Sequence, residues 1–407
     1  MMRKYRTDIG FSVMKYLFCA MAFMGMSCST QKKVPAPAPQ PTPPKTVAKD
    51  TVHAPAPKEV VHKEIKIGLL LPLDIKKHLD ALTDTSVDMG MDAYTLSQLQ
   101  FAEGAMLAAD SLNMTKQMVS IKISDAPADS FYLSNKLYKP DMLHADVILA
   151  SVPAANAATA ARIAKLHKQK IVFTQPVSTT SLTSYDNAYL AATSTTTQCE
   201  IAAAKLASAM PAAHFFLFTS DNKREQDIAV LFKPGLPASK TYSITNKAKL
   251  DSVAKHALRH EQVIIMVSSD EGFVSSTLNQ INAAADGTIT IMGLPTWENF
   301  ESIDYSLLKN LRVIYFTTGF VNSNDEHVKD FRNKYISRYN AEPMFAAYQG
   351  FELVMEFAAN KTDENRKQQK KRLLPFKFTQ IDSHGCFENQ YVRLIEVKNY
   401  ELIPLDE

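Results

Sequence analysis

Short apolar runs alternate with longer amphipathic stretches from Glu64 onward. The run Ile65-Lys66-Ile67-Gly68-Leu69-Leu70-Leu71 ends at Pro72, and an apolar run of this length is typical of a buried strand. Between residues 99 and 112 the apolar side chains recur at helical spacing, which indicates a helix packed on a sheet. The pattern therefore predicts strands and helices in alternation.

The alternation continues along the chain. Further strands are predicted at 119–123, 146–150, 170–174, 215–218, 263–267, 288–292 and 312–316, and further helices at 154–168, 198–210, 222–232, 249–258 and 274–284. Strands separated by such helices pair in parallel, because the crossover needs that length of chain. The part of the chain from Glu64 onward has about 340 residues, which is too many for a single sheet of five or six strands with its helices. We expect an α/β protein with two doubly wound parallel-sheet lobes joined by a hinge near residues 192–197.

Residues 1–27 have the organisation of a signal peptide. A basic stretch ends at Lys15 and is followed by an apolar run of about ten residues, too short to cross a bilayer. The segment Gly25-Met26-Ser27-Cys28 resembles the lipobox of bacterial lipoproteins, with Gly25 where Leu is usual. The resemblance implies that Cys28 becomes the lipidated N-terminus. The alternative is an ordinary secretory signal with an incidental cysteine.

Residues 28–63 are polar and rich in proline, which is typical of an extended spacer. The predicted organisation is therefore a lipid anchor, a tether and a folded part. Within the folded part, we expect the N-terminal lobe to comprise residues 64–193 and about 319–372. The C-terminal lobe is expected to comprise residues 194–318 and about 373–407.

Charge and cysteine content exclude several classes of protein. Without residues 1–27 the chain holds 41 basic and 41 acidic residues, and no Lys/Arg cluster indicates nucleic-acid binding. Cys199 and Cys386 remain after Cys19 is removed with the signal and Cys28 is lipidated. Two separate buried thiols are favoured, and a disulfide between them stays open. Neither metal-ligand spacing nor a cofactor motif is present, so no cofactor or metal is expected.

The ordered segments resemble a known fold. Residues 146–153, the Ala-rich helix that follows and residues 171–180 resemble the type I periplasmic-binding fold, most closely its leucine/isoleucine/valine-binding group. Segments 101–110, 335–348 and 385–395 match that family in the same order. The resemblance covers roughly residues 64–407. It implies a non-catalytic substrate-binding protein that closes two lobes on a small polar ligand and works with a permease.

Candidate ligand-binding residues follow the predicted strands of the first lobe. Ser178, Thr179 and Thr180 stand after a strand, where helix N-termini offer unpaired N–H groups to ligands. Their alternative role is only to cap the next helix. Ser151 and Asn156 correspond to the hydroxyl-bearing ligand loop of the family that the chain resembles.

The second lobe supplies two further candidates, Asp270 and Trp297. Asp270 follows the strand that ends at Val267, where the resemblance would place an aromatic residue. Trp297 either lines the ligand cleft or belongs to the core. Glu298 lies two or three positions beyond the place of the acid that pairs with a ligand ammonium. An ammonium buried without an anionic partner is costly, which argues against a standard α-amino acid as ligand.

The sequence leaves two principal functions open. The first is the membrane-tethered, non-catalytic substrate-binding lipoprotein described above. The alternative is a protein-interaction lipoprotein of the same fold that regulates cell-wall peptidoglycan synthesis, with a cell-wall synthase as partner. A hydrolase using His384 and Cys386 is a third reading, without any supporting catalytic motif. The chain also resembles Bacteroidetes-type lipoproteins, in which an acidic run after the lipidated cysteine is linked to surface export. No acidic run follows Cys28, so we expect a lipid anchor in the outer membrane that faces the periplasm.

Overall fold

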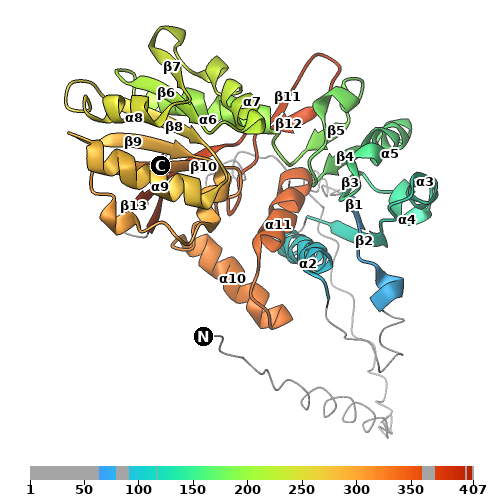
Figure 1. The fold of residues 1–407 in the computed structure, drawn as a ribbon. Coiled ribbons are helices and arrows are strands. Elements are labelled where there is room, and N and C mark those ends of the chain that lie inside the picture. The colour runs from blue at the N-terminus through green and yellow to red at the C-terminus, as the bar shows by residue number, and fades with distance from the viewer. Residues whose placement is uncertain (1–63, 79–90, 116, 360–371, 399–400, 406–407) are drawn as a thin grey trace, which may run out of the picture. The chain divides into compact units, whose positions relative to one another are not determined.

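The computed structural model describes residues 64–78, 91–115, 117–359, 372–398 and 401–405 (Figure 1). The predicted signal peptide, lipidation site and tether lie outside these residues. The described part of the chain holds two mixed sheets of seven strands each, and helices flank both sheets. None of its helices has the length and apolar character that a membrane crossing requires.

The first sheet is built around five parallel strands in the order β2-β1-β3-β4-β5. β12 pairs in parallel with β5, and β11 closes the edge as the antiparallel partner of β12. The central strands are buried on both faces, which explains their continuous apolar sequences. The strands are β1 (Ile65–Leu71), β2 (Val119–Asp125), β3 (Val147–Ala150), β4 (Lys170–Phe173), β5 (Ala188–Leu190), β11 (Phe378–Gln380) and β12 (Phe387–Asn389).

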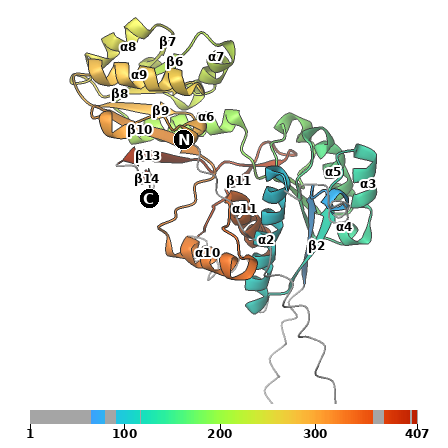
Figure 2. The ribbon, with the colours of Figure 1, turned by 60° about the horizontal axis from the view of Figure 1, so that its bottom comes forward.

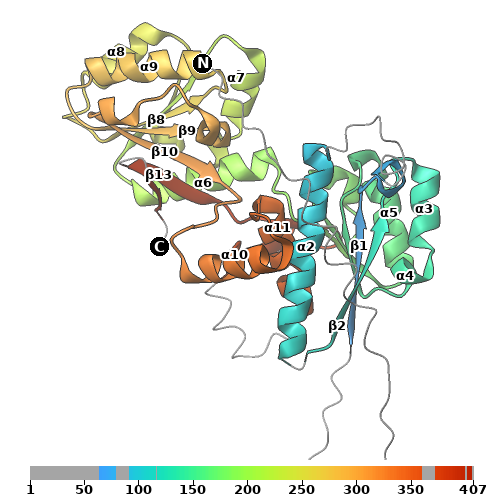
Figure 3. The same ribbon diagram turned by 90° about the horizontal axis from the view of Figure 1, so that it is seen from below.

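Helices cover both faces of the first sheet, as Figure 3 shows. One face carries α2 (Ala93–Met114) and α11 (Phe345–Ala358), and the other carries α3 (Ser130–Leu137), α4 (Pro140–Leu143) and α5 (Ala154–Leu166). α10 (Glu326–Tyr339) joins the first group, because the Tyr335 hydroxyl donates a hydrogen bond to the Glu103 carboxylate of α2.

Two glycines let α2 and α11 approach until their backbones touch (Figure 2). A Cβ atom added to Gly104 of α2 would lie 1.9 Å from the carbonyl oxygen of Ala347 in α11. A Cβ atom added to Gly350 of α11 would lie 2.0 Å from the carbonyl oxygen of Phe101. The contact therefore requires glycine at both positions.

The second sheet repeats the strand order of the first: its parallel strands run β7-β6-β8-β9-β10. β13 pairs antiparallel with β10, and β14 with β13. In Figure 3, α8 and α9 cover one face and α6 the other. The elements are α6 (Thr195–Ala209), β6 (His214–Thr219), α7 (Lys223–Val230), β7 (Thr241–Ile244), α8 (Lys247–Ala254), β8 (Gln262–Val267), α9 (Glu271–Ala284), β9 (Ile289–Gly293), β10 (Leu311–Thr317), β13 (Arg393–Lys398) and β14 (Glu401–Pro404).

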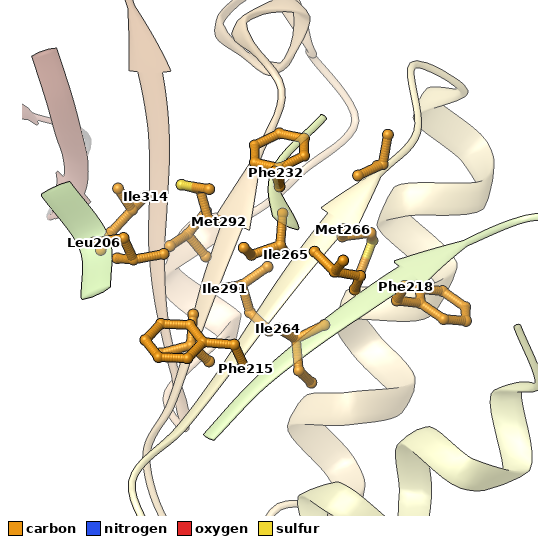
Figure 4. Close-up of a cluster of buried hydrophobic side chains, with 14 of the residues drawn as sticks. Leu206, Phe215, Phe218, Phe232, Ile264, Ile265, Met266, Ile291, Met292 and Ile314 are labelled. Carbon is orange, nitrogen blue, oxygen red and sulfur yellow. The ribbon is translucent and has the colours of Figure 1, made fainter. Parts of the chain in front are cut away.

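The core of the second lobe is a continuous apolar cluster on both sides of its sheet. Figure 4 shows Met292 and Ile314, from the neighbouring strands β9 and β10, beside Leu206 of α6. Cys199 belongs to this cluster, whereas Cys386 belongs to a core cluster of the first lobe. Both thiols are free and buried, so the prediction of two separate thiols is confirmed.

The predicted fold class is confirmed, with two differences in detail. The strands β11, β13 and β14 pair antiparallel with their neighbours. The expected lobe boundary at about 373 also differs from the structure. Residues 378–389 extend the first sheet beside β5, so the chain returns to the second sheet only with β13.

Candidate functional site

A cavity of about 280 Å³ lies in the first lobe, at the carboxyl ends of β4 and β5. Its wall comes from the N-terminal parts of α2 and α11, the residues that follow β4 and β5, Thr318 after β10, and the segment between α11 and β11. The lining residues are Ser97, Gln98, Phe101, Thr174, Gln175, Ala191, Ala192, Thr318, Phe345, Ala346, Gln349, Leu374 and Phe376. Ligands of open parallel sheets bind at this edge of the sheet.

Gln100 fixes the position of α11 beside α2 at this cavity. Its side-chain amide donates to the carbonyl of Glu342 at 3.2 Å, and its Oε1 accepts from the backbone N–H of Met344 at 2.7 Å. Both partners stand just before α11. The first residues of α11, Phe345 and Ala346, are therefore held against α2 as part of the wall.

Three glutamine side chains converge on the cavity from three different elements. Gln98 of α2 is 5% exposed, and its carboxamide forms no hydrogen bond with the described residues. Gln349 of α11 likewise has none within the described part of the chain. Gln175, after β4, donates through Nε2 to the Ser151 hydroxyl at 3.3 Å. The wall thus presents amide donors and acceptors that a ligand can satisfy.

The remaining lining is aromatic, aliphatic or hydroxylic. Phe101 is buried, while Phe345 is 46% exposed. Phe376 lines the wall from the segment before β11. None of the lining residues among those described carries a charge. The cavity is therefore polar but uncharged.

A buried carboxyl group lies behind this wall. Glu352, one helical turn beyond Gln349, is 3% exposed and accepts from the backbone N–H of Leu373 at 2.8 Å. Burial raises the pKa of Glu352 to about 7, although the Leu373 N–H and the Arg372 guanidinium act in the opposite direction. The bond to Leu373 holds the segment that carries Leu374 and Phe376 against α11.

The predicted site residue Ser151 supports this wall from behind. It follows β3, is buried, and its hydroxyl meets both Gln175 and the hydroxyl of Tyr94 at 3.3 Å. The predicted site residue Asn156 lies in α5, where its side-chain amide donates to the carbonyl of Ala128 at 2.8 Å. Asn156 thereby fixes the loop that precedes α3.

The three predicted residues after β4 form a short 3-10 turn over Thr179–Leu182. The hydroxyls of Ser178 and Thr180 are 2.7 Å apart, and both residues are exposed. Ser178 stands at the N-cap without a side-chain cap bond, while its carbonyl accepts from the N–H and hydroxyl of Ser181. Thr179 is half-buried, and none of the three belongs to the described lining of the cavity.

At the corresponding edge of the second sheet, the polar groups satisfy one another. Buried Glu225 accepts from the hydroxyls of Ser220 and Ser268 at 2.6 and 2.7 Å, on its two carboxylate oxygens. The predicted site residue Asp270 is exposed and caps α9, because its carboxylate accepts from the N–H of Phe273 at 2.8 Å. These contacts close the loops that follow β6 and β8.

Trp297 lies in the core of the second lobe. It is 1% exposed, its ring covers Gly293, and its indole N–H donates to the carbonyl of Ser268 at 2.9 Å. Of the two positions that the sequence allows for Trp297, the ligand cleft and the core, the structure has the core position. The glycine in β9 leaves the space that this ring occupies.

Sequence reasoning missed the glutamines of the cavity. Gln175 directly follows a predicted strand, a position that marks ligand-binding edges, but its neighbours Ser178 to Thr180 were preferred. Gln98 and Gln349 lie within helices, where a single polar residue gives no periodic signal. Only the packing of α11 on α2 brings them together.

The candidate catalytic pair does not have the environment of a nucleophile and its base. Cys386 is buried, and burial raises the pKa of its thiol to about 11. His384 is exposed. Across the described residues, no group of three or more His, Cys, Asp or Glu side chains is arranged to hold a metal ion.

Comparison with solved structures identifies the architecture. The chain matches an ABC transporter substrate-binding protein from Desulfitobacterium hafniense over 84% of its own length and 100% of that chain, with 15% identity and a TM-score of 0.50. It matches an ABC-type branched-chain amino acid transporter protein from Rhodopseudomonas palustris over 84% and 95%, with 13% identity and a TM-score of 0.54. The chain has the type I periplasmic-binding fold.

The fold likeness extends to a further kind of protein. Full-length LpoA from Haemophilus influenzae matches 85% of this chain with 10% identity and a TM-score of 0.54, over 59% of the LpoA chain. No protein-family description matches the sequence. No curated protein matches it either. The similarities thus establish the fold.

Proposed function

We propose that the protein is a membrane-tethered, non-catalytic solute-binding lipoprotein. Its small polar ligand binds in the cavity at the ends of β4 and β5, and the two lobes close on it. The observation that carries this proposal is the convergence of Gln98, Gln175 and Gln349 on a cavity at the ligand-binding edge of the sheet. Support comes from the shared fold of a solved substrate-binding protein.

The cavity is placed where a ligand can influence the connection between the lobes. Ala191 and Ala192 stand where the chain leaves the first lobe, and Thr318 stands where it returns. A ligand that contacts these residues binds one lobe arrangement better than another, which is the condition for ligand-driven closure.

The proposed setting is the cell envelope. Lipidation at Cys28 anchors the chain in the outer membrane, facing the periplasm, and residues 28–63 form the tether. A permease is the proposed partner that accepts the solute. In the alternative function, the partner is a cell-wall synthase, the protein regulates peptidoglycan synthesis, and the cavity is dispensable.

Binding measurements on cavity variants test the proposal. A metabolite screen by thermal shift and calorimetry should yield a ligand for the purified protein. Ala346→Leu should abolish its binding by filling the cavity, and Gln98→Ala should weaken it. Gln226→Ala, on α7 of the second lobe, is the matched control and should leave binding unchanged. Urea unfolding of each variant shows whether it is folded.

Two results would contradict the proposal. One is the absence of any binder, together with capture of a cell-wall synthase rather than permease subunits by crosslinking in intact cells. The other is a ligand whose binding is unaffected by Ala346→Leu. In that case, Ser178→Ala with Thr180→Val shows whether the loop after β4 holds the ligand instead.

A further inference from the structure

We propose that the cavity selects small amine-free solutes that carry both hydrogen-bond donors and acceptors, and that it excludes α-amino acids. This inference rests on the proposed function and specifies the class of solute. The observation that carries it is that three carboxamide side chains and the N-terminus of α11 surround one cavity. No described residue of its lining is acidic.

The first argument concerns charge. A ligand ammonium in this cavity would lose its hydration and meet no carboxylate among the described lining residues. The two buried carboxyl groups nearby do not belong to the lining. Glu352 accepts from the N–H of Leu373 on one oxygen and has the Arg372 guanidinium 4.0 Å from the other. Glu388 accepts from the N–H of Ser194 and the hydroxyl of Thr197.

The second argument is independent of the lining side chains. α11 begins at Phe345, and its N-cap residue, Met344, provides no side-chain hydrogen bond. Phe345 and Ala346, the first two residues of this 14-residue helix, line the cavity. The first N–H groups of a helix lack partners within the helix, and the helix dipole places partial positive charge there. This end of α11 repels a cation and favours an oxygen acceptor.

The carboxamides of the wall determine which hydrogen-bonding groups the solute carries. Gln98 is almost fully buried, yet neither its donor nor its acceptor is used by the described residues. A neutral carboxamide binds hydroxyl and amide groups without requiring an opposite charge. The cavity of about 280 Å³ lies just below the roughly 300–1,000 Å³ that ligand pockets span, so the solute is small.

Solutes that share one carbon skeleton and differ in charge test this selection. One set consists of 4-methylpentanamide (neutral), 4-methylpentanoate (anion), leucine (zwitterion) and leucinamide (cation), and equivalent sets use skeletons of two to eight carbons. Calorimetry on the full protein should show that the neutral amides, which are amine-free and carry both donors and acceptors, bind in at least one set. Their amine-bearing counterparts should bind weaker by about tenfold or more.

A charge-swapped variant gives the inference a second readout. Gln98→Glu places a carboxylate in the cavity and should raise the affinity for the cationic member relative to the neutral one by about tenfold. Gln226→Glu, on α7, is the control and should leave that ratio unchanged. Urea unfolding establishes that both variants are folded.

The inference is overturned if an amino acid or amine binds wild-type protein as tightly as its amine-free counterpart, or if no amine-free solute binds. A charged amine that binds in the cavity and is displaced by Ala346→Leu would leave the proposed function intact. A protein that binds no solute in either screen would contradict both.

Discussion

The Glu388 carboxylate accepts a hydrogen bond from the backbone N–H of Ser194, with 2.7 Å between the two atoms. Glu388 is 2% exposed and lies in β12 of the first sheet, whereas Ser194 caps α6 of the second lobe. Its other oxygen accepts from the hydroxyl of Thr197 at 2.8 Å. One buried carboxylate thus connects the end of the first sheet to the first helix of the second lobe.

Replacement of Glu388 should destabilise the protein. Glu388→Ala leaves a backbone N–H and a hydroxyl without their acceptors, and should lower the free energy of unfolding by about 2–4 kcal/mol. Glu388→Gln keeps one acceptor and should cost less. Urea unfolding measures both, with the exposed Glu301→Ala as control. Values within about 0.5 kcal/mol of wild type for Glu388→Ala would show that this contact contributes little.

Alanine at Gly104 or Gly350 should be strongly destabilising. The added Cβ meets backbone atoms at 1.9 and 2.0 Å, which cannot rotate away, so α2 and α11 must separate. We expect a loss of about 3 kcal/mol or more in the free energy of unfolding. Gly272→Ala in α9 is the matched control, because its Cβ meets only a side-chain oxygen at 3.5 Å, and should be neutral or slightly stabilising. Similar unfolding midpoints for all three variants would contradict this account.

The stability of the folded protein should depend on pH through Glu352. Burial raises its pKa from the ordinary 4.5 to about 7 in the folded state. Between these values the folded chain binds the proton and the unfolded chain does not. The stabilisation is therefore complete below pH 4.5 and is lost as pH rises through about 7.

Glu352→Gln removes this proton equilibrium. The unfolding free energy of wild type relative to this variant should fall by up to about 3 kcal/mol between pH 4.5 and pH 8. Urea unfolding at several pH values measures this difference. Parallel pH curves for the two proteins would mean that the Glu352 carboxyl titrates normally.

The two buried thiols should be unreactive in the folded state. Burial raises the pKa of Cys199 to about 12 and that of Cys386 to about 11, so neither forms much thiolate at pH 8. Iodoacetamide labelling followed by peptide mapping should modify both only after unfolding in urea. Rapid labelling of Cys386 in the folded protein would contradict this prediction and would favour the hypothesis of a hydrolase that uses His384 and Cys386.

Much of the fold was predictable, because long apolar runs and helical periodicity specify buried strands and amphipathic helices locally. β5 and β7 are too short to give a clear pattern, because they span only three and four residues, and β7 is the edge strand of its sheet. The placement of β11 and β12 also escaped prediction. Their pairing beside β5 joins residues that are far apart in the chain.

The candidate site was less predictable than the fold. Ser151 lies behind the cavity wall, in contact with Gln175, because it follows a strand, and the strand-end rule can be applied to a sequence. Gln98 and Gln349 meet only through the contact at Gly104 and Gly350, and no local pattern encodes that contact. The sequence also left open whether Trp297 lines the ligand cleft or belongs to the core. Its burial depends on the space beside Gly293, which only the structure shows.

The closed network around Glu225 in the second lobe has a consequence for engineering. Since Ser220 and Ser268 occupy both of its carboxylate oxygens, Glu225 leaves no free acceptor for a solute at this edge of the lobe. Redesign for another solute would then concentrate on α2, α11 and the loop after β4. The second lobe would be kept unchanged. A library of variants would then vary only a few positions of the first lobe.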